Sequence, residues 1–133
     1  MEEQPYTVML IDDNAIDNMI HTKVLERSRL STVIFNHNSA QSAIECIKNL
    51  AKIPDVGKQL MPSYIFLDLD MPLMDGFQFM AELDNLNENI KEGIKVVLLT
   101  ASQNVNDKEY PTKFKNFHKY LNKPLSIQKI EEL

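Results

Sequence analysis

Residues 64–76 read YIFLDLDMPLMDG, and they are the most informative part of the sequence for predicting the fold. Its first four residues, Tyr64 to Leu67, form an apolar run that ends at Asp68. A short apolar run followed by polar and turn residues predicts a buried strand. A helix is expected after Asp75-Gly76, and its inner side would carry Phe77, Met80 and Leu83.

Strands and helices are predicted to alternate on both sides of this stretch. Short apolar and β-branched runs predict four further strands, at residues 7–11, 33–35, 94–99 and 117–121. Asn14 and Ser39 are suitable N-caps for helices after the first two of these strands, and Ser126 for a final helix that ends at Leu133. Five strands alternating with helices predict a parallel sheet with helices on both faces.

The predicted helices carry apolar residues at helical spacing. After Asn14 these residues are Ile16, Met19, Ile20 and Val24, and after Ser39 they are Ala40, Ala43, Ile44, Ile47 and Leu50. Residues 104–110 predict a short helix that Pro111 ends, because a residue before proline resists the α region. Residues 52–63 contain two prolines and a glycine, and they predict a loop away from the carboxyl ends of the strands.

Composition excludes several classes of protein. A length of 133 residues predicts one domain over residues 1–133, and a net charge of −5 disfavours a nucleic-acid binder. The run from Tyr64 to Leu67 is far too short to span a bilayer, and the N-terminal residues lack the features of a signal peptide. The single cysteine, Cys46, excludes an internal disulfide and a cysteine-rich zinc site. We therefore expect a cytosolic single-domain protein.

Polar residues follow the predicted strands where these strands end. Asp12 and Asp13 follow the first strand and Asp68 the third. Thr100 follows the fourth, and Lys123 lies shortly after the fifth. Because the carboxyl ends of parallel strands share one edge of the sheet, these five residues are expected to lie together. Ordinary N-cap or loop roles would explain one or two of them but not the whole set.

Three neighbouring carboxylates and an ammonium group suit one kind of chemistry. The carboxylates would repel one another unless a cation neutralised them, and Mg²⁺ readily binds carboxylates, a backbone carbonyl and water. With such a cation and a lysine in place, one carboxylate can attack a phosphoryl group and form an aspartyl phosphate. The pattern therefore predicts a magnesium site for phosphoryl transfer.

Four segments resemble the receiver domain of two-component response regulators. They are Leu10-Ile11-Asp12-Asp13-Asn14, the stretch Phe66 to Gly76, Leu99-Thr100-Ala101 and Tyr120-Leu121-Asn122-Lys123-Pro124. They span almost the whole chain in the order of that family, and an aspartate followed by Met-Pro and Met-Asp-Gly is the most specific part. The resemblance implies the flavodoxin-like, doubly wound α/β fold, with five parallel strands in the order 2-1-3-4-5 and helices on both faces.

The resemblance also implies roles for the acidic residues. Asp68 would be the phosphoacceptor. Together with Asp68, the residues Asp12 and Asp13 and the backbone carbonyl of Asp70 would bind Mg²⁺ or Mn²⁺.

Further residues of the motifs would sense the phosphoryl group. Lys123 would pair with its oxygens, and Thr100 would hydrogen-bond one of them after transfer. Tyr120 would turn inward when Thr100 moves. Pro72 and Gly76 would shape the loop after the third strand, where glycine can relieve backbone strain.

The function implied by the resemblance is that of a stand-alone, cytoplasmic response regulator in a two-component system or phosphorelay. A sensor histidine kinase or a histidine phosphotransfer protein would phosphorylate it. The phosphorylated form would then bind another protein. We expect slow loss of the phosphoryl group rather than enzymatic turnover, and no direct contact with nucleic acid or membrane.

Two other functions fit parts of the sequence. Asp68-Leu69-Asp70 resembles the nucleophile motif of haloacid-dehalogenase-like phosphatases, which also use Mg²⁺. In that family, however, the acidic pair follows the nucleophile in the sequence, whereas Asp12-Asp13 precedes Asp68. There is also no room here for a cap domain. The second alternative is a flavodoxin-like or degenerate receiver that serves only as a binding module. The complete acidic set argues against degeneracy, and acidic residues after the first strand disfavour a flavin phosphate site.

Overall fold

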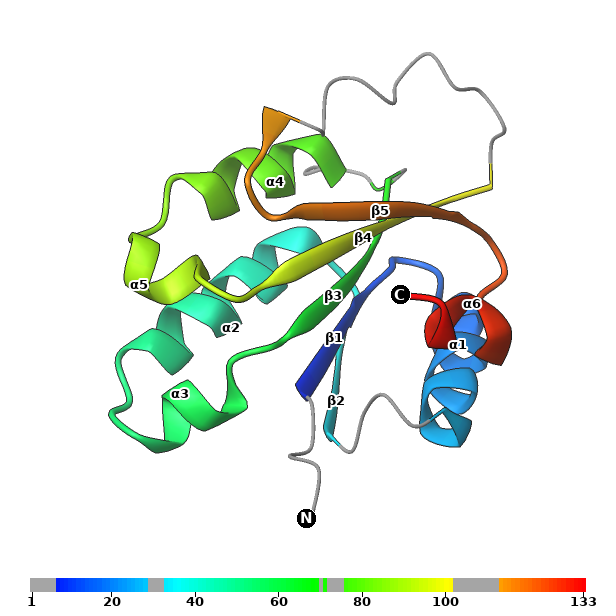
Figure 1. Cartoon of the computed structure of the whole chain (residues 1–133), viewed down its shortest axis with the longest axis horizontal. Helices are drawn as coiled ribbons and strands as arrows, with labels where there is room; N and C mark the ends of the chain where they lie inside the picture. Colours follow the sequence, from blue (N-terminus) through cyan, green and yellow to red (C-terminus); the bar gives the residue numbers. More distant parts are fainter. Residues whose placement is uncertain (1–6, 29–32, 70, 72–75, 102–112) are drawn as a thin grey trace.

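The computed structural model describes residues 7–28, 33–69, 71, 76–101 and 113–133. Its sheet contains β1 (Thr7–Ile11), β2 (Val33–His37), β3 (Tyr64–Asp68), β4 (Lys95–Thr100) and β5 (Phe117–Asn122). All neighbouring strands are parallel, in the order β2-β1-β3-β4-β5 (Figure 1). The predicted fold class and strand order are confirmed.

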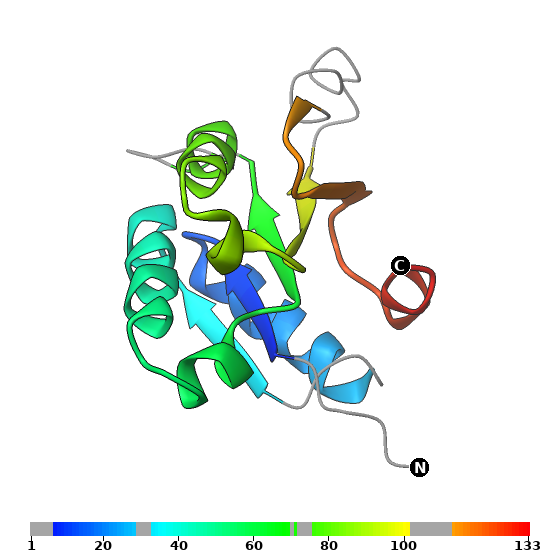
Figure 2. The ribbon, with the colours of Figure 1, turned by 60° about the vertical axis from the view of Figure 1, so that its left-hand side comes forward.

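Helices cover both faces of this sheet. They are α1 (Ala15–Arg27), α2 (Ala40–Ala51), α3 (Val56–Leu60), α4 (Gly76–Asp84), α5 (Glu88–Lys91) and α6 (Ile127–Glu131). Figure 2 shows α2 and α4 on one side of the sheet, with α1 and α6 on the other. None of the helices within the described ranges is long and apolar enough to cross a bilayer.

The alternation of side chains along the central strands creates two cores. Met9 and Ile11 of β1 and Leu67 of β3 pack with α2 and α4 on one face. Leu10 and Phe66 point to the opposite face and pack with residues of α1 and α6. Every residue of β1 and β3 is buried, as expected for strands covered on both sides.

The three predicted N-caps are confirmed. The Asn14 side chain accepts hydrogen bonds from the backbone N–H groups of Ile16 and Asp17. Ser39 and Ser126 cap α2 and α6 in the same way. The last helix was predicted to continue to Leu133, but it ends at Glu131.

Helix α1 forms where its periodicity predicts, but most of the apolar residues that predicted it do not face the core. Ile16, Met19 and Ile20 are 64%, 56% and 45% exposed. The buried residues of α1 are His21 and Leu25. The apolar spacing therefore located the helix without identifying its inner face.

The prediction that the segment 52–63 is a simple loop is wrong. The segment contains the one-and-a-half-turn helix α3, which follows Asp55, a residue with a φ angle of 63°. Figure 1 shows α3 at the lower left, away from the carboxyl ends of the strands, as expected for this segment. The predicted helix at 104–110 and the residues Asp70 and Pro72 lie outside the described residues.

Candidate functional site

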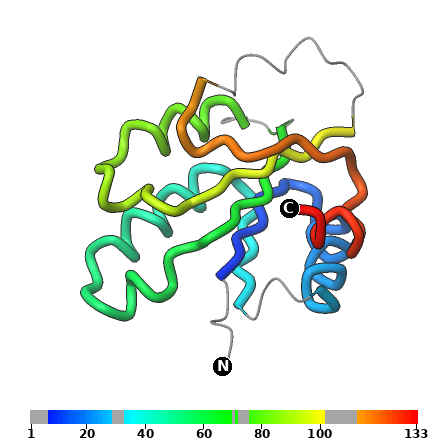
Figure 3. Tube along the Cα trace, viewed as in Figure 1, coloured from blue at the N-terminus to red at the C-terminus, as the bar shows by residue number. Residues whose placement is uncertain are grey.

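The carboxyl ends of the central strands bring three aspartates together. The chain runs from lower left to upper right through β1, β3 and β4 in Figure 3, so these strands end on the same side of the molecule. Asp68 is the last residue of β3, and Asp12 follows β1, its neighbour in the sheet. Carboxylate oxygens of Asp12, Asp13 and Asp68 all lie within 4.8 Å of one another. The structure thus unites the three acidic residues that the sequence singled out.

The three carboxylates differ in their exposure to solvent. Asp12 is 2% exposed and Asp68 is 5% exposed, whereas Asp13 is exposed. A cluster of oxygen ligands that is open on one side allows a hard divalent cation to enter and to keep some of its water. The residues present therefore fit Mg²⁺ or Mn²⁺.

Helix α1 fixes the position of Asp12. The Asp12 carboxylate accepts a hydrogen bond of 2.9 Å from the backbone N–H of Asn14. The Asn18 side chain donates to the carbonyl oxygens of Asp12 and His37 at 2.7 and 3.3 Å, and so ties α1 to the ends of β1 and β2. Both contacts are local to the edge of the sheet where the carboxylates lie.

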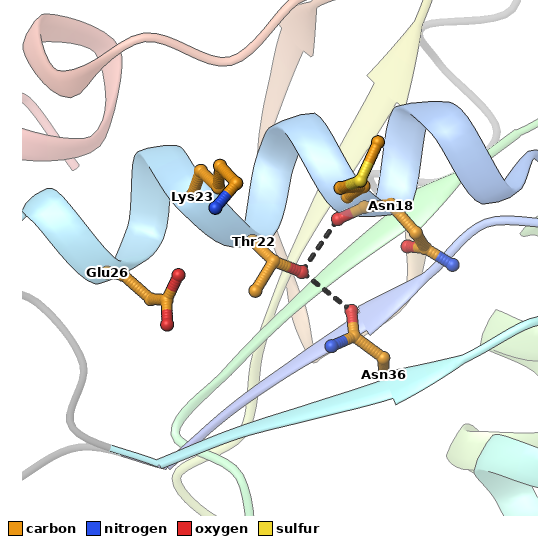
Figure 4. Close-up of a pocket in the computed structure, with 6 residues that line it drawn as sticks. Asn18, Thr22, Lys23, Glu26 and Asn36 are labelled. Atoms are coloured by element: carbon orange, nitrogen blue, oxygen red, sulfur yellow. Dashed lines mark hydrogen bonds between the residues drawn. The ribbon is translucent and has the colours of Figure 1, made fainter.

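A second contact anchors α1 on the sheet one turn further along. In Figure 4, Asn18 and Thr22 of α1 lie near Asn36 of β2. The Thr22 hydroxyl is 2.6 Å from the carbonyl oxygen of Asn18 and 3.0 Å from Oδ1 of Asn36. The shallow hollow of about 330 Å³ beside these residues contains none of the clustered aspartates. We interpret these contacts as support for the position of α1 rather than as a ligand site.

Lys123 reaches the aspartates from the end of β5. Its backbone N–H donates to the carbonyl oxygen of Thr100 at 2.9 Å, which aligns the segment with the end of β4. Its Nζ lies 3.0 Å from Oδ2 of Asp12 and 3.3 Å from Oδ1 of Asp68. The predicted lysine thus contacts two of the predicted carboxylates.

The surroundings of Lys123 keep its ammonium group charged. Burial alone would lower the pKa of Lys123. Its hydrogen bonds to Asp12 and Asp17 and the negative charges of Asp68 and Asp12 nevertheless raise this pKa above its ordinary value. A permanent positive charge therefore lies beside the Asp68 carboxylate.

Asp17 belongs to this cluster, although it was not among the predicted site residues. Its Oδ2 lies 3.2 Å from Nζ of Lys123. The signal in the sequence was an acidic residue four positions after Asp13, in the first turn of the predicted helix. Acidic residues are common there because they interact favourably with the helix dipole, so this signal alone is not specific.

The two predicted switch residues lie on β4, which is next to β3, and on β5, which pairs with β4. Thr100 is the last residue of β4, one position beyond Leu99, which is paired with Asp68. Tyr120 lies in β5, and its ring packs edge-on against Phe117 with 5.3 Å between the ring centroids. Both residues are therefore near the edge that carries the carboxylates, whereas Asp70 is not among the described residues.

Gly76 fits closely behind Asp68. A Cβ atom at this position would lie 2.8 Å from Cδ2 of Leu69, 3.0 Å from Cα of Leu69 and 3.3 Å from the carbonyl oxygen of Asp68. Its φ angle does not fall in the left-handed region. Close approach of the backbone, rather than the relief of strain expected from the sequence, accounts for this glycine.

Comparison with known proteins identifies this arrangement. A family model described as the response regulator receiver domain matches residues 8–133. The chain is 25% identical over 130 residues to the probable methanogenesis regulatory protein FilR2 of Methanothrix harundinacea, a match that covers 97% of this chain and 79% of that protein. Some other curated relatives are much longer, and the match covers only 9% of the sensor histidine kinase CheAY of Helicobacter pylori.

Solved structures agree with this match. A response regulator receiver protein from Dyadobacter fermentans is 29% identical, with a TM-score of 0.79 and coverage of 95% of this chain and 92% of that chain. The Mn²⁺-bound form of response regulator Rcp1 is 25% identical, with a TM-score of 0.71 and coverage of 96% and 88%.

Proposed function

This chain belongs to the response regulator receiver domain family, and we propose that Asp68 is the residue through which it accepts a phosphoryl group. Members of this family are phosphoacceptor signalling modules of two-component systems, and this chain is one of them. The observation that supports Asp68 is its place beside both the carboxylate cluster and the Lys123 ammonium. We infer that the single receiver domain extends over residues 1–133.

The transfer would be a direct displacement at phosphorus. An oxygen of the Asp68 carboxylate forms a bond to phosphorus while the bond between phosphorus and a donor imidazole nitrogen breaks. The bonding pair stays on that nitrogen, so the donor histidine returns to its ordinary form. Lys123, already 3.3 Å from Asp68, would offset the charge of the phosphoryl oxygens.

Asp12, Asp13 and Asp68 would hold a divalent cation, together with the backbone carbonyl of Asp70. Carboxylate oxygens within 4.8 Å of one another and an exposed Asp13 support this assignment. When bound, Mg²⁺ or Mn²⁺ supplies positive charge toward the phosphoryl oxygens. The protein's part is to keep the Asp68 oxygens fixed, which β3 does from the centre of the sheet.

The readout would be a change in protein binding. Phosphorylation adds about −1.5 to −2 charges at a site that already contains several carboxylates. Thr100 and Lys123 would move toward this charge, and Tyr120 would change its packing in response. A sensor histidine kinase or a histidine phosphotransfer protein is the donor we propose. A cytoplasmic location and the absence of direct nucleic-acid or membrane contacts remain predictions.

We do not favour the phosphatase alternative. The match to the receiver family covers residues 8–133, and Asp12-Asp13 precedes Asp68 as that family requires. Some relatives are protein-glutamate methylesterases, but the chain spans only 20% of their length. We propose that this chain catalyses no turnover reaction and loses its phosphoryl group slowly.

Incubation with acetyl phosphate and Mg²⁺ tests the assignment of Asp68. We expect the intact protein to gain the mass of one phosphoryl group, and the gain to disappear in Asp68→Asn and when the cation is chelated. Asp55→Asn is the matched control, because it removes a carboxylate from the exposed segment before α3. Labelling of Asp68→Asn equal to that of the wild type would refute the assignment.

A further inference from the structure

Asp17 contacts the functional lysine from outside the four motif segments. Its Oδ2 lies 3.2 Å from Nζ of Lys123, close to the 3.0 and 3.3 Å distances made by Asp12 and Asp68. Three carboxylates thus surround one ammonium group. Nζ of Lys123 donates hydrogen bonds to Asp12 and Asp17 and forms an ion pair with Asp68, so a phosphoryl oxygen that arrives at Asp68 competes with these carboxylates for the three N–H donors of the ammonium group.

Helix capping does not explain the orientation of the Asp17 side chain. An acidic residue at this position of a helix often reaches back to the backbone N–H of the N-cap residue. Here that N–H, on Asn14, already donates to Asp12. The Asp17 carboxylate instead contacts Lys123, 106 positions away in the sequence.

Asp17 is also the partner that Lys123 can lose most easily. The side chain of Asp17 is 34% exposed, whereas those of Asp12 and Asp68 are 2% and 7% exposed. A carboxylate near the surface regains water when its ion pair opens, but a buried one would remain poorly solvated. Asp12 also keeps its hydrogen bond from Asn14.

We propose that Asp17 is a positioning residue that competes with the phosphoryl group for Lys123. It holds the ammonium group in the unphosphorylated protein and gives it up when a phosphoryl oxygen arrives at Asp68. The inference rests on the proposed function. Asp17 therefore weakens binding of the phosphoryl group and slows its acquisition.

Beryllofluoride, a mimic of the phosphoryl group, provides the test. Asp17→Asn keeps the size of the side chain and removes its charge. We expect it to bind beryllofluoride about threefold more tightly, as measured by ¹⁹F NMR titration with Mg²⁺ present, and to be labelled faster by acetyl phosphate. Asp17→Glu restores the charge and should return both quantities toward the wild-type values. Glu26→Gln removes an exposed charge from the other end of α1 and should change neither.

The same substitution made in Lys123→Met protein shows whether Asp17 acts through Lys123 or only repels the negatively charged beryllofluoride. In Lys123→Met, Asp17→Asn should no longer tighten beryllofluoride binding. An equal effect in both backgrounds, or no effect of Asp17→Asn in the wild-type background, would overturn the proposal. If wild-type protein is labelled at Asp68 while Asp17→Asn behaves identically, only this inference fails. If wild-type protein is not labelled at all, the proposed function fails and this inference fails with it.

Discussion

Gly76 lies against the part of the backbone that carries Asp68. Because an added Cβ would lie 3.0 Å from Cα of Leu69, Gly76→Ala must displace backbone rather than only a flexible side chain. We expect overpacking to lower the free energy of unfolding by about 1–3 kcal/mol. Urea unfolding measures this change, and acetyl phosphate labelling should also slow because Asp68 precedes Leu69.

Gly93→Ala is the matched control for Gly76→Ala. No atom lies within 4 Å of a Cβ at Gly93, but its φ angle of 85° is unfavourable for alanine. This variant should therefore lose stability through backbone strain at a position just before β4 begins, while labelling stays at the wild-type rate. Equal slowing of labelling in both variants would contradict the local explanation.

Individual site residues differ in how well the sequence could predict them. Asp12, Asp68 and Lys123 each follow or end a strand, so parallel topology alone brings them to one edge. Asp17 lies within a helix, and its contact with Lys123 depends on how α1 is rotated on the sheet. Sequence periodicity does not determine that rotation here, so this partner was missed.

Helix α1 has an exposed apolar surface. Met19 is 56% exposed, whereas Leu25 is fully buried between α1 and the sheet. We expect Met19→Gln to change the free energy of unfolding by less than about 0.5 kcal/mol, and Leu25→Ala to reduce it by about 2–5 kcal/mol. Urea unfolding of the two variants checks this difference. A large loss of stability in Met19→Gln would show that this side chain is buried in solution.

The same helix explains why a correct helix prediction gave the wrong inner face. Four apolar residues recur at helical spacing in α1, yet only Val24 among them packs partly against the core. The face toward the sheet instead carries His21 and the side chain of Asn18, which bonds to the ends of β1 and β2. The observed rotation of this helix therefore goes with the hydrogen bonds of Asn18 and the burial of Leu25, not with burial of Ile16, Met19 and Ile20.

Helix α3 was missed for a different reason. Proline and glycine ordinarily mark loops, and Pro54 and Gly57 lie at its beginning. Proline is tolerated before a helix, and a Cβ at Gly57 would be 1.9 Å from the carbonyl oxygen of Leu50. The glycine here permits α3 to pack against the end of α2, a tertiary contact that local sequence does not show.

The whole molecule places its polar chemistry at one edge of an otherwise buried sheet. The central strands β1 and β3 are apolar until their carboxyl ends, where Asp12 and Asp68 follow. This change of polarity is visible in the sequence, which is why both the fold and most of the site could be predicted. The buried strand β3 at the centre of the sheet therefore holds Asp68, while α1 contributes Asp17, which contacts Lys123 beside it.

Histidines link the stability of the whole molecule to pH. The pKa of each described histidine lies below the ordinary value of 6.5, and burial is the main cause in all three. The negative charges of Asp17 and Asp12 oppose this effect at His21. The positive charges of Lys95 and Lys119 add to it at His118. The unfolded chain therefore takes up protons near pH 6.5 while the folded protein does not. The stabilisation is fully present above this pH and is lost as the pH falls toward the lowered values.

His21 should account for part of this pH dependence. It is 2% exposed, and its buried Nδ1 has no hydrogen-bond partner among the described residues, so this nitrogen gains no hydrogen bond when the ring is protonated. We expect the urea midpoint of the wild type to fall between about pH 7.5 and about pH 5.5, and to fall less in His21→Gln. Comparing the two proteins at each pH removes the general effect of a changing net charge. Parallel curves would mean that the His21 imidazole is protonated equally in the folded and unfolded states, contrary to its burial on the inner side of α1.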